Sequence, residues 1–152
     1  MSGKQVDITI LIADDDRDDR EMTLEAFQEN RLRNDLHFVE DGEQVLRFLR
    51  HQAPFEDALR YPRPGLILLD LNMPRLDGRS TLKAIKADEA LRQIPVIVLT
   101  TSKAEEDVFS SYDVGASSYI RKPVKLSALV EAVGQIGRYW LEIVDLPEGE
   151  RK

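Results

Sequence analysis

Several apolar runs of this chain end in side chains that can bind a metal ion or an anion. The acidic pair Asp14-Asp15 follows the run ITILIA, and Asp70 follows LILL. Thr100 follows PVIVL, and Lys122 follows the short run SYIR. Carboxylate oxygens bind hard divalent ions, a lysine ammonium attracts an anion, and a hydroxyl can donate a hydrogen bond to that anion. These residue types indicate phosphoryl chemistry at a metal ion, if the fold gathers them in one place.

The apolar runs must be neighbouring strands of one sheet for these side chains to share a site. The run before Asp70 is continuously apolar and is followed by the turn-forming sequence LNMPRLDG, which is typical of a parallel strand buried on both faces. Strand and helix patterns alternate along the chain. This predicts an α/β fold with a doubly wound, five-stranded parallel sheet and helices on both faces.

The expected elements are short and separated by turn residues. We expect strands at 8–13, 36–40, 66–70, 95–99 and 118–121, and helices at about 17–31, 45–49, 78–90, 104–114 and 125–144. Residues 52–64 contain three prolines and no clear period, so they are read as a surface loop. With the strand order 2-1-3-4-5, the first and third strands are neighbours at the topological switch point, so their carboxylates lie side by side.

The composition limits the classes of protein to consider. The chain has 152 residues, 42% of them hydrophobic, and a formal net charge of −7, which predicts one globular domain. The negative charge argues against broad nucleic-acid binding, and the absence of cysteine excludes disulfides and thiolate metal sites. No apolar run approaches the ~20 residues of a membrane span, and no signal-peptide pattern is present. We therefore expect a cytoplasmic protein with no membrane partner.

A divalent cation would resolve the charge conflict in the expected site. Three crowded carboxylates repel one another unless a cation lies between them. Mg²⁺ takes oxygen ligands in octahedral geometry and keeps positions for water and phosphate oxygens. Asp70 is then the candidate carboxylate nucleophile, with the Lys122 ammonium and the Thr100 hydroxyl beside the phosphoryl group.

Four separate motifs make the chain resemble a response-regulator receiver domain of two-component signalling. They are the acidic pair, LDLNMPRLDG around Asp70, Thr100, and YIRKP around Lys122. The resemblance covers about residues 8–144 and implies the flavodoxin-like receiver fold. It also implies that Asp70 accepts a phosphoryl group from a phosphohistidine of a sensor histidine kinase.

The resemblance further implies a ligand set for Mg²⁺. Asp15 and Asp70 would bind the ion directly, together with the backbone carbonyl of Asn72, and Asp14 would bind it through a water molecule. Thr100 and Tyr119 match the switch pair of the family, and Lys122 would pair with a phosphoryl oxygen.

Two features resemble a subgroup, the single-domain response regulators associated with bacterial phytochromes. These features are the long 52–64 loop and the ending YWLEIVDLP. The subgroup implies a bacteriophytochrome, a light-regulated histidine kinase, as phosphodonor. It also implies a homodimer through the face that includes the last helix. In the sequence, apolar residues lie on a second flank of that helix and on the helix before it, and they form a candidate dimer surface: Val108, Tyr112, Tyr139 and Ile143.

The expected organisation is one receiver domain at 8–144, with an N-terminal segment at 1–7 and a C-terminal tail at 145–152. No output domain follows Lys122 in this sequence. We therefore expect signalling by conformational change, docking or dimerisation, and no enzymatic activity on a separate substrate beyond self-phosphorylation and slow dephosphorylation. We expect structural roles for Asp16, as a helix cap, and for His37 and His51, as surface residues.

Three alternatives remain open from the residues. The chain could be an intermediate phosphotransfer receiver in a phosphorelay. It could be a Mg²⁺-dependent aspartyl phosphatase, whose nucleophile would follow the first strand, but that would leave the LDLNMPRLDG motif without a role. A flavodoxin-like cofactor binder shares the fold, but acidic residues after the first strand would repel the phosphate of its ligand.

Overall fold

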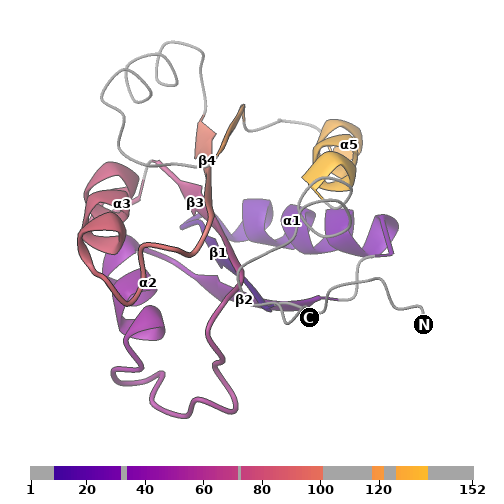
Figure 1. The fold of residues 1–152 in the computed structure, drawn as a ribbon. Coiled ribbons are helices and arrows are strands. Elements are labelled where there is room, and N and C mark those ends of the chain that lie inside the picture. The colour runs from indigo at the N-terminus through magenta and orange to yellow at the C-terminus, as the bar shows by residue number, and fades with distance from the viewer. Residues whose placement is uncertain (1–8, 32–33, 72, 101–117, 122–125, 137–152) are drawn as a thin grey trace.

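The five strands form one parallel sheet in the order β2-β1-β3-β4-β5, as predicted (Figure 1). The computed structural model describes residues 9–31, 34–71, 73–100, 118–121 and 126–136. The elements along the chain are β1 (Thr9–Ala13), α1 (Arg17–Glu29), β2 (Asp35–Val39), α2 (Gly42–Leu49), β3 (Leu66–Asp70), α3 (Gly78–Ala87), β4 (Val96–Thr100), β5 (Ser118–Arg121) and α5 (Leu126–Ile136).

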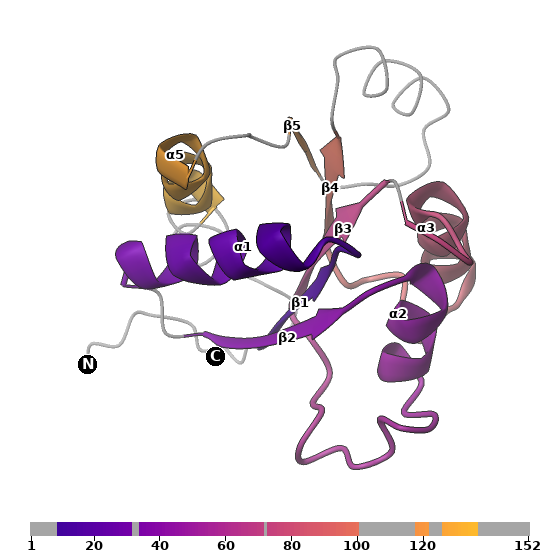
Figure 2. The same cartoon turned by 180° about the vertical axis from the view of Figure 1, so that it is seen from behind.

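Helices cover both faces of the sheet, so the central strands β1 and β3 are buried along their whole length, whereas β2 is buried only at Val39. Helices α2 and α3 lie on one face, and α1 and α5 lie on the other (Figures 1 and 2). Alternate strand residues point to opposite faces. In β1, Leu11 packs with the α2 and α3 side while Ile10 and Ile12 pack with the α1 and α5 side. Burial on both faces explains why β1 and β3 are almost continuously apolar instead of alternating apolar and polar residues.

Three helices begin at an aspartate that caps the free N–H groups of the first turn. The Asp16 side chain accepts from the amides of Asp18 and Asp19, which confirms its predicted role as the cap of α1. Asp41 caps α2 and Asp77 caps α3 in the same way. Asp16 and Asp41 lie three and two residues after the ends of β1 and β2, so these two connections are short, while Asp77 lies seven residues after the end of β3.

Most predicted boundaries hold to within two residues. The two largest differences among the described helices are equal. Helix α2 begins three residues earlier, at Gly42, because the Asp41 side chain caps it there, and α3 ends three residues earlier, at Ala87, because the Asp88 side chain accepts from the Ala90 amide and begins a turn. The helix predicted at 104–114 and the predicted end of the last helix, after Ile136, lie outside the described residues. In the described residues, no helix has the length and apolar character of a membrane span.

The segment before β3 was predicted to be a plain surface loop, but two of its aromatic side chains pack against α2. Phe55 and Tyr61 pack on Phe48 of α2, with ring centroids 5.2 and 5.7 Å from the Phe48 ring. His37 contacts both Phe48 and Tyr61, and the His51 Nε2 lies 2.9 Å from the Tyr61 carbonyl oxygen. Both histidines are therefore half-buried, and the prediction that they are surface residues is wrong in this respect.

Candidate functional site

Three carboxylates meet where β1 and β3 end. Asp14, Asp15 and Asp70 each offer one oxygen, and these oxygens lie within 4.8 Å of one another. Asp14 and Asp70 are buried, with 1% and 3% of their surfaces exposed, while Asp15 is exposed. The set consists of hard oxygen donors with one open side, which fits a divalent ion such as Mg²⁺. The structure thus brings together the three acidic residues that the sequence predicted.

Strand pairing explains why residues 56 positions apart in the chain, Asp14 and Asp70, become neighbours. Ala13 and Leu69 are register partners in the parallel β1 and β3 pair, so the next residue of each strand lies at the same edge. The Asp14 amide donates to the Val39 carbonyl of β2 over 3.0 Å. Its side chain accepts from the Asp16 amide, also over 3.0 Å. The β1–α1 turn is therefore held between β2 and the start of α1.

The turn after Asp70 is closed by a glycine that packs against the backbone of the site. The Gly78 amide donates to the Leu71 carbonyl over 3.0 Å. A Cβ atom on Gly78 would lie only 2.5 Å from the Asp70 carbonyl oxygen and 2.7 Å from the Leu71 Cα. Only a residue without a side chain fits there, so the glycine allows α3 to begin directly behind Asp70.

An ion pair holds this turn to the end of β2. The Arg75 Nε donates to the Asp41 carboxylate over 2.7 Å, and the Asp41 side chain is 2% exposed. Arg75 has a φ of 63°, a left-handed conformation that a non-glycine residue adopts only at a cost. Burial raises the pKa of the Asp41 carboxyl, but the hydrogen bonds from the Gln44 amide and Arg75 outweigh it and hold this pKa below its ordinary value of 3.8.

Asp41→Asn is expected to lower the free energy of unfolding at neutral pH by about 1–3 kcal/mol, because it removes a buried charge-assisted hydrogen bond. Asparagine still caps α2. Since the pKa of Asp41 is lowered in the folded protein, its contribution is complete above 3.8 and is lost as the pH falls through the folded-state pKa. Urea unfolding at about pH 7 and about pH 3 should therefore show a difference from wild type that shrinks in acid. A difference independent of pH would contradict this assignment; Asp77→Asn, at an exposed cap, is the control.

The remaining predicted site residues are placed only in part. Thr100 ends β4, and its register partner in β5 is Arg121, so β4 and β5 end at the same edge of the sheet as β1 and β3. Tyr119 is the register partner of Val98. Outside the described residues lie Lys122, Asn72, Val108, Tyr112, Tyr139 and Ile143. Their roles stay predictions.

The contacts that two arginines make near the site were not predicted from the sequence. Arg75 reaches Asp41 across 34 positions, and Arg20 donates to the Asp14 carbonyl over 2.8 Å. No local pattern marks an arginine whose partner lies on another element or on the main chain. The Asp41-Gly42 turn after β2 was the available signal, since it follows a strand that ends at the same edge as Asp14 and Asp70.

The fold and the acidic cluster together define a receiver-type α/β protein, and comparison with known proteins agrees. A model of the response regulator receiver domain family matches residues 10–134. The response regulator Rcp1 of Synechocystis sp. is 40% identical over 138 residues, which cover 91% of this chain and 92% of that protein. The chain belongs to the response regulator receiver domain family.

Solved structures of phytochrome response regulators are similar over nearly the whole chain. The phosphorylated cyanobacterial phytochrome response regulator RcpA has a TM-score of 0.83 and 38% identity, and the match covers 93% of this chain and 99% of that one. The Mn²⁺-bound form of Rcp1 has a TM-score of 0.80 and 39% identity, with 92% and 99% covered. The response regulator RPA3017 in red light signalling of R. palustris has a TM-score of 0.85 and 36% identity, with 92% and 98% covered. These proteins support the phytochrome-associated subgroup.

Proposed function

We propose that Asp70 accepts a phosphoryl group from a sensor histidine kinase in a Mg²⁺-dependent reaction. The observation that carries this proposal is the cluster of Asp14, Asp15 and Asp70, with three carboxylate oxygens within 4.8 Å. A buried carboxylate beside two metal-binding carboxylates is a suitable nucleophile for phosphoryl transfer. The Mn²⁺-bound structure of the relative Rcp1 supports a divalent ion at such a site.

The reaction joins an Asp70 carboxylate oxygen to phosphorus. As that bond forms, the bond from phosphorus to the donor breaks, and the donor keeps the electron pair: imidazole for a phosphohistidine, acetate for acetyl phosphate. The Mg²⁺ ion, when bound, offsets the charge of the carboxylates and of the phosphoryl oxygens. Asp15 and the Asn72 carbonyl would hold the ion with Asp70, and Asp14 would hold it through water. Asp14 and Asp70 are buried where they lie, which limits their freedom to leave the site.

The proposed mechanism gives further roles to Lys122, Thr100 and Tyr119. Thr100 ends β4 at the edge where Asp70 ends β3, and Lys122 follows the last residue of β5. A lysine ammonium there would pair with a phosphoryl oxygen, and a threonine hydroxyl would donate to another. Movement of the Thr100 hydroxyl toward the phosphate would let the ring of Tyr119, in β5, turn inward behind it.

The phosphodonor and the assembly are proposed from the subgroup. The similarity to the phytochrome response regulator RcpA and to RPA3017 in red light signalling favours a bacteriophytochrome kinase as donor. We place the receiver domain at 8–144, and the family model matches residues 10–134 within these bounds. A homodimer would use Val108, Tyr112, Tyr139 and Ile143, which form an apolar flank in the sequence.

Incubation of the purified protein with acetyl phosphate and Mg²⁺ tests the proposal. Intact mass should rise by one phosphoryl group, peptide mapping should place it on Asp70, and EDTA should prevent the gain because the carboxylate cluster then lacks its cation. Sedimentation of the same samples tests the dimer. A protein that gains no mass with Mg²⁺ present, or gains equally with EDTA, would rule out the proposed reaction.

A further inference from the structure

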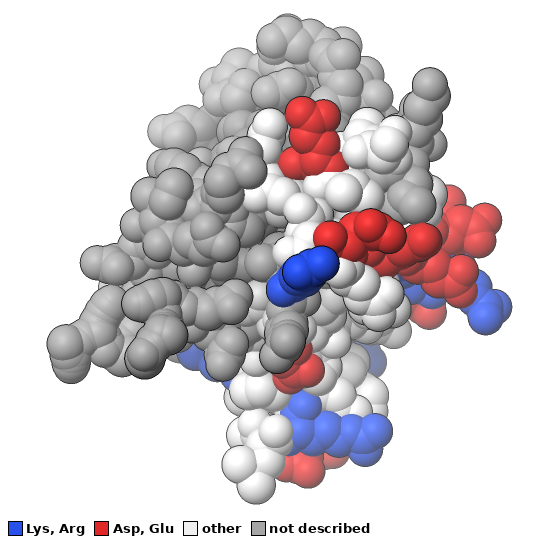
Figure 3. All heavy atoms as spheres, turned by 90° about the vertical axis from the view of Figure 1, so that its right-hand side faces the viewer, with Lys and Arg blue, Asp and Glu red and all other residues white. Residues whose placement is uncertain are grey.

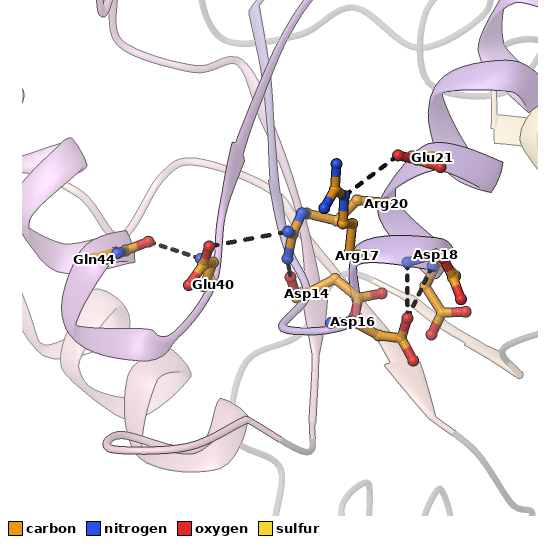
Figure 4. Close-up of polar contacts among 9 residues, drawn as sticks. Asp14, Asp16, Arg17, Asp18, Arg20, Glu21, Glu40 and Gln44 are labelled. Carbon is orange, nitrogen blue, oxygen red and sulfur yellow. Dashed lines mark hydrogen bonds and ion pairs between the residues drawn. The ribbon is translucent and has the colours of Figure 1, made fainter.

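The main chain of Asp14 is held by an arginine that lies outside the proposed ligand set. The Arg20 Nη1 donates to the Asp14 carbonyl over 2.8 Å, and the arginine side chain is only 19% exposed (Figure 4). The Asp14 amide and carboxylate are bonded to Val39 and Asp16. Arg20 therefore supplies the third restraint on the residue that brings one carboxylate into the cluster and is joined directly to Asp15.

The position of Arg20 in its helix is unfavourable unless these contacts compensate. It lies in the first turn of α1, where the helix dipole favours acidic side chains and disfavours cations. Helix α1 is strongly acidic, and red acidic side chains form a band on the face in Figure 3. Arg17, in the same first turn, illustrates the ordinary arrangement: it is 82% exposed and pairs along the helix with Glu21 at 3.5 Å. Arg20 instead turns back over the β1–α1 turn.

The carbonyl contact is the stronger of the two that Arg20 makes. Its Nη2 lies 3.9 Å from a carboxylate oxygen of Glu40, whose side chain is 55% exposed. An exposed pair at that distance contributes little. A guanidinium that donates over 2.8 Å to a carbonyl beside buried groups makes a charge-assisted hydrogen bond. The Glu40 amide donates to the Gln44 side chain over 2.7 Å, which holds Glu40 in place just after β2. The weaker contact, between Arg20 and Glu40, therefore directs the arginine side chain toward β2.

We infer that Arg20 is a positioning residue for the metal site: its hydrogen bond to the Asp14 carbonyl fixes the turn that presents the Asp14 and Asp15 carboxylates to the cation. The inference rests on the proposed function, because it assigns a role toward the same Mg²⁺ ion. Two effects of Arg20 oppose each other. Its charge repels a metal ion, while its hydrogen bond orders the ligands of that ion. The short distance and low exposure make the ordering effect the larger one.

The test measures Mg²⁺ binding by calorimetric titration without a phosphodonor, and the initial rate of phosphorylation by acetyl phosphate across the same Mg²⁺ range, in wild type, Arg20→Gln, Arg20→Lys and Arg17→Gln. A small donor avoids any effect on kinase docking. We expect Arg20→Gln to raise the half-saturating Mg²⁺ concentration by about 10-fold, the low end for partners that orient metal ligands. The limiting rate at saturating Mg²⁺ should stay within about twofold, because the ion then draws the ligands into place.

Two variants separate position from charge. Arg17→Gln removes the same charge from the same turn of α1 and should change the half-saturating Mg²⁺ concentration less than about twofold, since an exposed charge is well screened. Arg20→Lys keeps the charge and one donor to the carbonyl, and should recover affinity to within about threefold of wild type. Arg20→Met, which keeps the aliphatic stem, replaces Arg20→Gln if that variant melts below the assay temperature.

Each outcome decides between the alternatives. Equal titrations for Arg20→Gln and Arg17→Gln, or tighter Mg²⁺ binding after Arg20→Gln, would overturn the inference, because charge alone would then account for Arg20. Equal losses in Mg²⁺ affinity and limiting rate would also overturn it, since they would indicate a general loosening of the fold. A wild-type protein that is not phosphorylated would instead refute the proposed function.

Discussion

Asp70→Asn is expected to abolish phosphoryl uptake from acetyl phosphate, with no gain in mass under conditions that label the wild-type protein fully. Asparagine has nearly the same shape but lacks the carboxylate that forms the acyl phosphate. Asp70 lies at the end of β3 with 3% of its surface exposed, so a water molecule or a neighbouring side chain has little room to replace it. Intact mass measurement over time provides the test.

The same variant should be more stable than wild type when no divalent ion is present. Three carboxylates within 4.8 Å repel one another, and the substitution removes one of the charges. Thermal unfolding in EDTA at low ionic strength should show a higher melting temperature, and added Mg²⁺ should favour the wild type instead. Asp77→Asn is the matched control, since it removes a charge from an exposed cap in the same turn and should leave phosphorylation unchanged. Phosphorylation that survives in Asp70→Asn and is lost in Asp14→Asn would indicate the aspartyl phosphatase alternative.

Gly78→Ala is expected to lower the free energy of unfolding by about 2–3 kcal/mol, because a side chain there must displace backbone atoms. The added carbon would lie 2.5 Å from the Asp70 carbonyl oxygen and 2.7 Å from the Leu71 Cα, and neither atom can move without moving β3. In a domain of this size that loss corresponds to a fall in melting temperature of roughly 4–12 °C. Because Asp70 would shift with its carbonyl, the phosphorylation rate should also fall, by up to about 100-fold for a displacement of 1 Å.

Gly134→Ala in α5 is the comparison for that variant. Its added carbon would lie 2.7 Å from the Asn30 Oδ1, a side-chain atom that can shift more easily than backbone, although the amide nitrogen of Asn30 donates to the Ala26 and Val130 carbonyls. Alanine also favours the helix by about 1 kcal/mol over glycine. The stability should therefore change by less than about 1 kcal/mol, and the phosphorylation rate should stay at the wild-type value. A Gly78→Ala protein as stable and active as wild type would show that the turn after β3 can yield, and that its close packing does not position Asp70.

The sheet and the acidic part of the site could be predicted from sequence because their signals are local. Continuous apolar runs such as 66–70 are expected only when a strand is covered on both faces, and the residue after such a run lies at the carboxyl edge. The strand order then makes Asp14 and Asp70 neighbours, as the structure shows. Leu11 and Ile12 pack in two different hydrophobic cores, because neighbouring residues of a strand point to opposite faces of the sheet.

The long-range polar contacts could not be predicted in the same way. An arginine that bonds to a carbonyl, as Arg20 does to Asp14, leaves no pattern in the spacing of residue types. The aromatic contacts of Phe55 and Tyr61 were missed for a related reason. Prolines and charged residues dominate residues 52–64, and two separated aromatic residues have no period that reveals a shared partner in α2.

The packed segment before β3 lies at the end of the sheet away from the acidic cluster. It enters the sheet at the first residue of β3, and Asp70 is the last, so the two lie at opposite ends of a five-residue strand, about 13 Å apart at the usual rise. Tyr61 and Phe55 anchor the segment to α2, while Leu59 between them is 95% exposed. A fluorophore or an affinity handle joined at Leu59 should therefore report on this protein without disturbing its metal ligands.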